Sequence, residues 1–498
     1  MAQTSTLSRL GLTPLRGDPQ RAITGLALDS RAVKPGMLFA ALPGSRIHGG
    51  EFIGFALRMG AGAVLTDRAG AALAAEALAD HPEVALVVAE DARAALAMAA
   101  ALWFGAQPGC TVAVTGTNGK TSVASFARQL WAMLGHGAIS IGTTGVEGSW
   151  EAPLAHTTPD ALTLQRILAE AAEAGITHAA MEASSHGLDQ RRLEGVRLAA
   201  AGFTNLSQDH LDYHADMESY FTAKAGLFTR LLPDDAPAVI NTDDPWGARL
   251  AEMLASDQPE RPLIRIGAAP GCELRLLAQR FEAHGQHLRF ALKEVTHQVH
   301  LPLVGGFQGA NALLALGLVL ASGTPAGDAI AALPRLQGVR GRMQLAATRA
   351  NGAPVFVDYA HTPAAVETAL RALRPHVMGR LIVVLGAGGD RDRGKRPLMG
   401  RAAAENADIV YVTDDNPRSE DPATIRRAVL DACPEAHEVG DRAEAILRAV
   451  DALLPGDALL IAGKGHEQGQ TVGDTVYPFD DVEQASTAVE VLDRRVKP

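Results

Sequence analysis

The amino-acid sequence predicts an α/β protein of three domains. Hydrophobic residues make up 47% of the 498 positions but aromatic residues only 4%, which is typical of helices rich in Ala, Leu and Val packed on strands of small residues. A chain of this length exceeds what one hydrophobic core can organise. Short apolar β-runs also alternate with helical stretches along most of the chain. We expect domains over residues 1–100, 101–337 and 338–498.

The first domain is expected to be a small α/β unit. Two strand-like runs, at 23–31 and 36–42, precede Ala-rich helical stretches.

Five β-runs predict a mostly parallel sheet in the central domain, because helical segments separate several of them. The runs are residues 112–114, 138–141, 178–181, 199–203 and 238–240. Polar residues follow each run, and ligands of open α/β sheets bind outside the carboxyl ends of the strands. We therefore expect these polar segments to converge on one rim of the sheet.

The first of these runs leads into a predicted phosphate-binding loop. Its residues are Gly116, Thr117, Asn118, Gly119, Lys120, Thr121 and Ser122. In such a loop the glycines let the backbone approach a nucleotide, the lysine reaches the outer phosphates and the threonine can hold Mg²⁺. Val114 stands where the usual pattern has its first glycine, so the loop is a variant. The alternative is a chance glycine turn, which the β-branched run before it and the Lys-Thr-Ser after it disfavour.

A second, Rossmann-like α/β sheet is predicted for the third domain. Its strands are expected at 355–357, 381–385, 409–412 and 458–462, and each ends in polar residues that imply a second functional rim. The segment Gly386-Ala387-Gly388-Gly389-Asp390-Arg391 is not a dinucleotide fingerprint. Arg391 occupies the place of its third glycine and prevents close contact of helix and strand.

Composition also excludes several functional classes. The net charge of −11 argues against a nucleic-acid surface, which needs clustered Lys and Arg. Cys110, Cys272 and Cys433 are scattered without metal-ligand spacing, which favours a reducing cytoplasm. The N-terminus lacks an apolar signal region and the apolar run at 313–321 is too short for a bilayer, so no export or membrane segment is expected. Our default expectation is a monomer.

Three further residues gain meaning beside the phosphate loop. Singly, Glu182 is an ordinary loop carboxylate, His210 a satisfied polar residue and Lys224 a helix lysine with its head in solvent. Together with the loop, and in the same order over nearly the whole chain, they resemble the Mur ligase family, ATP-dependent enzymes that form amide bonds in peptidoglycan precursor synthesis. The resemblance implies that CO₂ carbamylates Lys224 to N6-carboxylysine. It also implies that this carbamate, Glu182, His210 and Thr121 bind Mg²⁺.

The third domain resembles one branch of that family, whose members add meso-diaminopimelate to UDP-N-acetylmuramoyl-L-alanyl-D-glutamate. Asp415-Asn416-Pro417-Arg418 matches its selectivity motif. A planar guanidinium grips a carboxylate bidentately, so we expect Arg418 and Arg391 to hold the distal carboxylate, which lysine lacks. Gly463 and Glu467 match the remaining amino-acid contacts, Glu467 facing the distal ammonium. The alternative for Asp-Asn-Pro-Arg is a simple proline turn.

The resemblance also implies sites for the other two substrates. Residues matching UDP-sugar-dipeptide contacts are Leu28, Ser30, Thr157, Thr158, Ser184, Gln190 and Arg192. Residues matching ATP contacts beyond the loop are Asn311, Arg342, Asp358 and His361. Gln308 and Arg340 depart from the family pattern, which has asparagine and proline there, and this affects only the adenine pocket and the interdomain hinge.

The implied reaction passes through an acyl phosphate formed from the D-glutamate carboxylate and ATP. A lysine-adding ligase is the nearest alternative, and Arg418 disfavours it. Folylpolyglutamate synthase shares the loop and the lysine but should lack Asp-Asn-Pro-Arg. A P-loop switch or motor that drives a partner protein, and an inactive relative that only binds a UDP-sugar, are alternatives from other classes.

Overall fold

The structure is a computed structural model that describes residues 4–44, 47–154, 156–211 and 213–496. Two compact units make up the chain. The first comprises residues 1–265 with 317–325, and the second 266–316 with 326–498. Within the described residues, no helix has the length and apolar character needed to cross a membrane.

The first unit begins with a small parallel sheet. Its strands, in spatial order, are β3 (Leu26–Ala27), β4 (Leu38–Ala41), β5 (Ala63–Thr66) and β6 (Ala85–Val88). The helices that accompany it are α1 (Ile53–Arg58), α2 (Arg68–Leu73), α3 (Ala75–Ala79) and α4 (Ala92–Phe104). Two hydrophobic clusters contain alternating residues of these strands, one cluster on each face of the sheet.

The strand expected at 23–31 is wrong as one element. Ala22–Ile23 (β2) pairs with Ser5–Thr6 (β1), β3 follows separately, and Ser30–Ala32 form a short 3₁₀ helix. The helix forms because the Asp29 carboxylate accepts the Arg31 backbone N–H at 2.9 Å and caps it. Ser30 therefore lies on this turn and not in a strand.

The central sheet of the first unit contains all five predicted strands. Its order is β12-β11-β7-β10-β8-β9, and the described pairs are parallel except that of β8 with β9. The strands are β7 (Cys110–Thr115), β8 (Ala138–Gly142), β9 (Gly145–Gly148), β10 (His178–Glu182), β11 (Ala200–Phe203) and β12 (Ala238–Asn241). The chain leaves β7 toward one side of the sheet and later returns to its other side, so the carboxyl end of β7 is the topological switch point.

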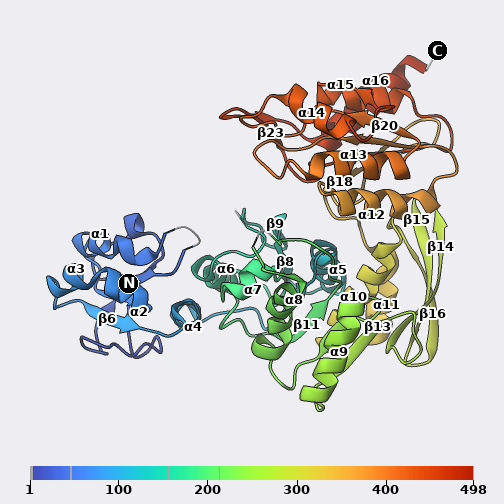
Figure 1. Cartoon of the computed structure of the whole chain (residues 1–498). Coiled ribbons are helices and arrows are strands. Elements are labelled where there is room, and N and C mark those ends of the chain that lie inside the picture. The colour runs from blue at the N-terminus through green and yellow to red at the C-terminus, as the bar shows by residue number, and fades with distance from the viewer. Residues whose placement is uncertain (1–3, 45–46, 155, 212, 497–498) are drawn as a thin grey trace. The chain divides into compact units, whose positions relative to one another are not determined.

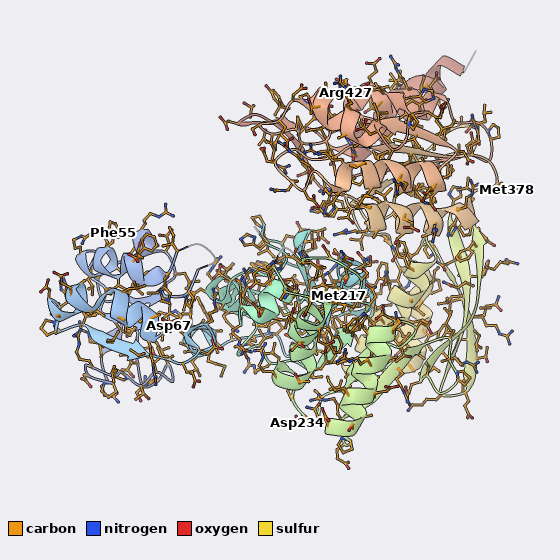
Figure 2. The ribbon with its side chains drawn as sticks, viewed as in Figure 1. Phe55, Asp67, Met217, Asp234, Met378 and Arg427 are labelled. Carbon is orange, nitrogen blue, oxygen red and sulfur yellow. The ribbon has the colours of Figure 1, made fainter. Side chains whose placement is uncertain are left out.

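Five helices connect these strands and pack on the sheet. They are α5 (Lys120–Met133), α6 (Ala161–Glu173), α7 (Ser185–Asp189), α8 (Met217–Gly226) and α9 (Pro245–Asp257). Met217, labelled in Figure 2, begins α8, the helix that carries Lys224.

Asp160 caps α6, and its loss should be measurable. Its carboxylate accepts the backbone N–H groups of Leu162 and Thr163 at 3.0 and 3.1 Å. Asp160→Ala should lower the free energy of unfolding of the first unit by about 1 kcal/mol, whereas Asp160→Asn, which keeps an acceptor, should cost less. All four tryptophans lie within residues 1–265, so tryptophan fluorescence during urea unfolding reports this unit. Equal losses in both variants would contradict the capping role.

The second unit contains an antiparallel meander that the sequence analysis does not predict. Strands β14 (Leu274–Glu282), β15 (Gly285–Leu292) and β16 (Val295–Leu301) lie side by side (Figure 1), after β13 (Leu263–Gly267), which spans the unit boundary. The β15–β16 turn uses Lys293 and Glu294 at φ 46° and 73°, where a glycine or asparagine would be the usual signal. Helices α10 (Phe307–Ala321) and α11 (Ala326–Ala332) follow.

A six-stranded sheet forms the rest of the second unit, with order β17-β18-β22-β19-β20-β21. The four predicted strands are present as β18 (Pro354–Asp358), β19 (Leu381–Leu385), β20 (Ile409–Val412) and β22 (Ala458–Ala462), with parallel neighbours. Four further strands are not predicted from the sequence: the edge strands β17 (Gln344–Thr348) and β21 (His437–Glu438), and the hairpin of β23 (Gly469–Val472) and β24 (Thr475–Pro478). Hydrophobic clusters cover both faces, with helices α12 (Pro363–Leu373), α13 (Lys395–Asn406), α14 (Pro422–Leu430), α15 (Arg442–Asp451) and α16 (Asp481–Val496).

The observed α/β architecture with mostly parallel sheets confirms the predicted fold class. The residue limits given for the three domains stay a prediction.

Candidate active site

The phosphate-binding loop lies at the switch point of the central sheet. It connects the carboxyl end of β7 to the N-terminus of α5, as a nucleotide cradle requires. Gly116 has φ 142°, and a Cβ there would overlap Thr204 Oγ1. Gly119 has φ 85° and precedes the first residue of α5. Both glycines therefore occupy positions that side chains disfavour.

Two lysines converge on one carbonyl oxygen of this loop. Lys120 Nζ donates to the oxygens of Gly116 and Thr117 at 2.9 and 2.7 Å. Lys224 Nζ donates to the same Gly116 oxygen at 2.7 Å and lies 4.6 Å from the centre of the Tyr220 ring. The loop and α8 thus bring the two predicted catalytic lysines together.

Lys224 is the more unusual of the two because it is fully buried. Burial, with a contribution from the charge of Lys120, lowers the pKa of the Lys224 amine well below its ordinary value. The amine therefore loses its proton more readily than the amine of an exposed lysine, and a neutral amine has a lone pair available as a nucleophile.

Glu182 ends β10 beside the loop. Its Oε2 accepts the Thr121 hydroxyl at 3.1 Å, and its Oε1 accepts the Thr143 backbone N–H at 2.7 Å. Register explains the position, because Glu182 pairs with Val114 of β7, two residues before Gly116. A hydroxyl and a carboxylate are the hard oxygen donors that Mg²⁺ prefers, so this donor set fits the ion.

His210 stands on the segment after β11 with φ 54°. Its ring packs edge-on against His186, with 4.9 Å between ring centres, and its Nε2 lies 3.5 Å from Asp209 Oδ2. Burial, together with the nearby charges of Lys120 and Lys224, lowers the pKa of His210. The ring therefore lies within electrostatic reach of the two lysines and is biased toward its neutral form.

The residues predicted to bind the UDP-sugar dipeptide in the central domain form a connected network around Glu182. Thr143 Oγ1 lies 3.0 Å from Thr157 Oγ1, and Thr158 Oγ1 donates to the Glu182 carbonyl at 2.8 Å. The Ser184 backbone N–H donates to Thr158 Oγ1 at 3.0 Å. The Arg192 guanidinium donates to the Thr158 carbonyl at 2.6 Å and to Gln190 Oε1 at 2.8 Å. Leu28 and Ser30 have no part in this network; Leu28 directly follows β3 of the small first sheet, and Ser30 begins the 3₁₀ helix after it.

Of the four ATP-contact residues predicted in the second unit, Asp358 lies on β18 and Asn311 on α10, whereas Arg342 and His361 lie between elements. Asp358, at the end of β18, accepts the backbone N–H groups of Met343 and Ala360 at 2.7 and 2.9 Å, and burial raises the pKa of Asp358. The Arg342 guanidinium stacks 4.8 Å from the centre of the Tyr359 ring.

His361 and Asn311 complete this predicted set. His361 Nδ1 lies 2.8 Å from the Tyr359 carbonyl, and burial lowers the pKa of His361. On α10, the Asn311 amide donates to Gln308 Oε1 at 3.0 Å. The glutamine that departs from the family pattern therefore still orients Asn311.

Asn416 is the centre of the predicted amino-acid site. Its Nδ2 donates to Glu467 Oε2 at 2.9 Å, while its Oδ1 accepts Lys464 Nζ at 3.1 Å and the Thr471 backbone N–H at 2.9 Å. Lys464 is fully buried and also donates to Glu467 Oε2 at 3.1 Å. The motifs do not single out Lys464, although its position between Gly463 and Glu467 was a usable signal.

Arg391 lies in the segment after β19, and Arg418, in the segment after β20, contacts that same segment. Arg418, at φ 52°, donates NH1 to the Gly389 carbonyl at 2.8 Å, and Arg391 donates NH1 to the Asp390 carbonyl at 3.2 Å. A Cβ on Gly388 would lie 2.9 Å from Arg418 NH1, so glycine leaves room for the guanidinium.

Asp415 and Gly463 close the same cluster. A Cβ on Gly463, whose φ is 116°, would lie 2.6 Å from Asp415 Oδ2. Pro417, between Asn416 and Arg418, directs the turn, and its carbonyl fills the space that a side chain on Gly389 would need. The predicted motif residues thus come together at the carboxyl ends of β19, β20 and β22.

Family models match most of the chain. The Mur ligase middle domain matches residues 114–319, the Mur ligase glutamate ligase domain 341–465 and the Mur ligase family catalytic domain 22–103.

Individual relatives match at nearly full length. UDP-N-acetylmuramoyl-L-alanyl-D-glutamate--2,6-diaminopimelate ligase of Mesorhizobium japonicum is 49% identical over 96% of this chain and 98% of its own length. The protein of the same name from Caulobacter vibrioides is 49% identical over 98% of this chain and all of its own. A solved structure of a ligase of that name superposes with a TM-score of 0.73 at 33% identity, covering 98% of this chain and 99% of the other. With the phosphate loop, Lys224 and Glu182 assembled as the sequence predicts, these matches lead to one conclusion: the chain belongs to the Mur ligase family.

Proposed function

We propose that the chain is the ATP-dependent ligase that joins meso-2,6-diaminopimelate to the D-glutamate of UDP-N-acetylmuramoyl-L-alanyl-D-glutamate, a step of peptidoglycan precursor synthesis. The observation that carries this proposal is the convergence of Lys120 and Lys224 on the Gly116 carbonyl, beside Glu182, at the switch point of a nucleotide-binding sheet. The relatives that share 49% of its residues over almost the whole chain bear the name of that ligase. The predicted selectivity residues also form one cluster.

The chemistry has two steps. The free D-glutamate carboxylate attacks the γ-phosphorus of ATP, which gives an acyl phosphate and releases ADP. The amine of diaminopimelate then attacks the acyl carbon, loses a proton and expels phosphate, which leaves an amide. Lys120 neutralises the negative charge that gathers when carboxylate and triphosphate approach one another. Holding the two reactants in line supplies much of the remaining acceleration.

Lys224 is proposed to act as a carbamate. Its neutral amine attacks CO₂ and loses a proton, which converts a buried cation into a carboxylate. Thr121, Glu182, His210 and this carboxylate would hold Mg²⁺, which when bound supplies positive charge to the phosphates. The support is the low pKa of the Lys224 amine and the oxygen donors around Glu182.

The amino acid is proposed to bind through Arg418 and Arg391, which pair with its distal carboxylate, and through Glu467, which faces its ammonium. Asp415, Asn416, Pro417 and Gly463 shape this site. Lys464 and Asn416 hold the Glu467 carboxylate at Oε2, which leaves its other oxygen for the ligand.

The other two substrates are assigned to the remaining predicted residues. Arg192, Gln190, Ser184, Thr158, Thr157, Ser30 and Leu28 bind the UDP-sugar dipeptide, and the loop with Asn311, Arg342, Asp358 and His361 binds ATP. We also expect a monomeric cytoplasmic enzyme without nucleic-acid or membrane partners, on the strength of its acidic charge and composition.

Phosphate release tests the proposal. The purified chain is given ATP, Mg²⁺ and UDP-N-acetylmuramoyl-L-alanyl-D-glutamate, with meso-diaminopimelate, with L-lysine or with no amino acid. Release should require meso-diaminopimelate. Preference for lysine would keep the reaction and overturn the role of Arg418. Release independent of any amino acid, or dependent on a partner protein, would favour a P-loop ATPase of another class.

A further inference from the structure

The antiparallel meander of the second unit carries a cluster of metal-ligating side chains that no step of the ligase reaction uses. Glu282 ends β14, His287 lies on β15 and His300 on β16. His287 Nε2 lies 3.0 Å from Glu282 Oε1, and His300 Nε2 lies 3.8 Å from Glu282 Oε2. Among the residues that the structure describes, this is the one group of three His, Cys, Asp or Glu side chains whose ligand atoms all lie within 4.8 Å of one another.

Strand register explains why these side chains meet. His287 and His300 are directly opposite one another in the β15–β16 pair, and their ring centres are 5.1 Å apart. Directly opposed residues point to the same face of an antiparallel sheet, at the closest approach that two strands allow. Glu282 reaches the same place from the end of the neighbouring strand, where it pairs with Gly285.

A buried histidine fixes the backbone that carries Glu282. His376 Nδ1 lies 2.6 Å from the Glu282 carbonyl, while its Nε2 accepts the Gly305 backbone N–H at 3.0 Å. Because Gly305 N–H can only donate, the His376 proton resides on Nδ1, and the ring links the end of β14 to the segment between β16 and α10. The carboxylate is therefore presented from a braced backbone position, although the side chain itself is partly exposed.

We propose that Glu282, His287 and His300 form a binding site for a borderline divalent transition-metal ion of the Zn²⁺ class, which clamps β14, β15 and β16 together. Two imidazole nitrogens and one carboxylate oxygen are a ligand set that Zn²⁺ takes in proteins. Ligands about 2.0–2.2 Å from a tetrahedral ion lie about 3.3 Å apart, which is close to the observed separations. The partial exposure of all three side chains leaves the fourth position to water.

Arg280 is the neighbour that competes with the ion. Its guanidinium donates to Glu282 Oε1 at 3.0 Å, but the Arg280 side chain is 73% exposed. Such a surface pair holds its partner weakly, so a metal ion can displace the guanidinium into solvent.

Isothermal titration of Zn²⁺ into the full chain, freed of metal by a chelator and kept without nucleotide or phosphate, tests this site. We expect one site whose affinity falls by about tenfold or more in each of Glu282→Gln, His287→Gln and His300→Gln, since each removes a direct ligand. His297→Gln is the matched control. His297 lies on β16 on the opposite face from His300, stacked on Phe290, so its loss should leave the affinity unchanged.

Two additional measurements keep the test decisive. Arg280→Ala should leave the affinity unchanged or raise it, and Zn²⁺ should raise the melting temperature of the wild type but not of His287→Gln. Far-UV circular dichroism checks that each variant is folded. Wild-type affinity in His287→Gln and His300→Gln, or an equal loss in His297→Gln, would show adventitious binding and overturn the site. Phosphate release by the ligase reaction is a separate readout, so failure of this site leaves the proposed function intact.

Discussion

Replacing Lys224 with alanine should lower kcat for amide formation by about 10²–10³-fold, the loss typical of removing one group that stabilises charge in a transition state. Lys224 is fully buried against the Gly116 carbonyl, so in the proposed reaction its side chain acts next to the phosphates assigned to the loop. As a carbamate it supplies a carboxylate, which alanine cannot replace. The measurement is steady-state phosphate release with all three substrates saturating.

Three comparisons distinguish a carbamate from a merely structural lysine. Lys224→Arg keeps a cation but cannot be carbamylated in the same way, so it should be as inactive as Lys224→Ala. Removal of dissolved CO₂ and bicarbonate should slow the wild type and leave the residual rate of Lys224→Ala unchanged. Acetate or propionate, which fits the space vacated in Lys224→Ala, should restore part of the rate. Full activity in Lys224→Arg, or a wild type indifferent to CO₂, would contradict the carbamate.

The pH dependence of this activation has a defined sign. Burial lowers the pKa of the Lys224 amine, so the amine is neutral at a lower pH than an exposed lysine would be. Activation by CO₂ should therefore extend to a lower pH than it would for an exposed lysine, and it should fail as the pH falls through that lowered pKa, where protonation removes the nucleophilic lone pair.

Much of the central site could be predicted because its signals are local. A strand that leads into the loop Gly116 to Ser122, and a carboxylate at the end of the neighbouring parallel strand, as Glu182 is, fix both the loop and its neighbour through sheet topology. The parallel strands of both large sheets could also be predicted from the sequence, because buried parallel strands are continuous apolar runs.

The parts that could not be predicted depend on non-local contacts or unusual turns. Strands β14 to β16 alternate polar and apolar residues and turn at Lys293 and Glu294, which carry no turn signal. Ser30 lies on a 3₁₀ turn that the Asp29 cap decides. Lys464 lies three residues before Glu467, but its contact with Asn416 spans 48 residues of the chain and forms only when folding brings the ends of β20 and β22 together.

Substituting Arg418 should change which amino acid the enzyme accepts. Arg418→Ala removes the group that we propose to pair with the distal carboxylate of diaminopimelate, and loss of one partner from a desolvated charge pair costs about 2–5 kcal/mol. The value of kcat/KM for meso-diaminopimelate should therefore fall by about 30- to 5000-fold, mainly through KM. The value for L-lysine, which has no distal carboxylate, should change little or rise. The measurement is phosphate release with each amino acid in turn.

The contact of Arg418 NH1 with the Gly389 carbonyl makes a structural role the main alternative, because the same side chain also supports the turn after β19. Arg418→Lys decides between the two, since it keeps a charge but not the bidentate grip. It should still discriminate poorly if recognition of the carboxylate is the role. Arg427→Ala is the matched control, because Arg427 is an exposed arginine on α14 (Figure 2) and its loss should leave both kinetic values unchanged. Equal losses for diaminopimelate and lysine in Arg418→Ala would show that the guanidinium supports the turn, and the source of the selectivity would then have to be sought at Arg391.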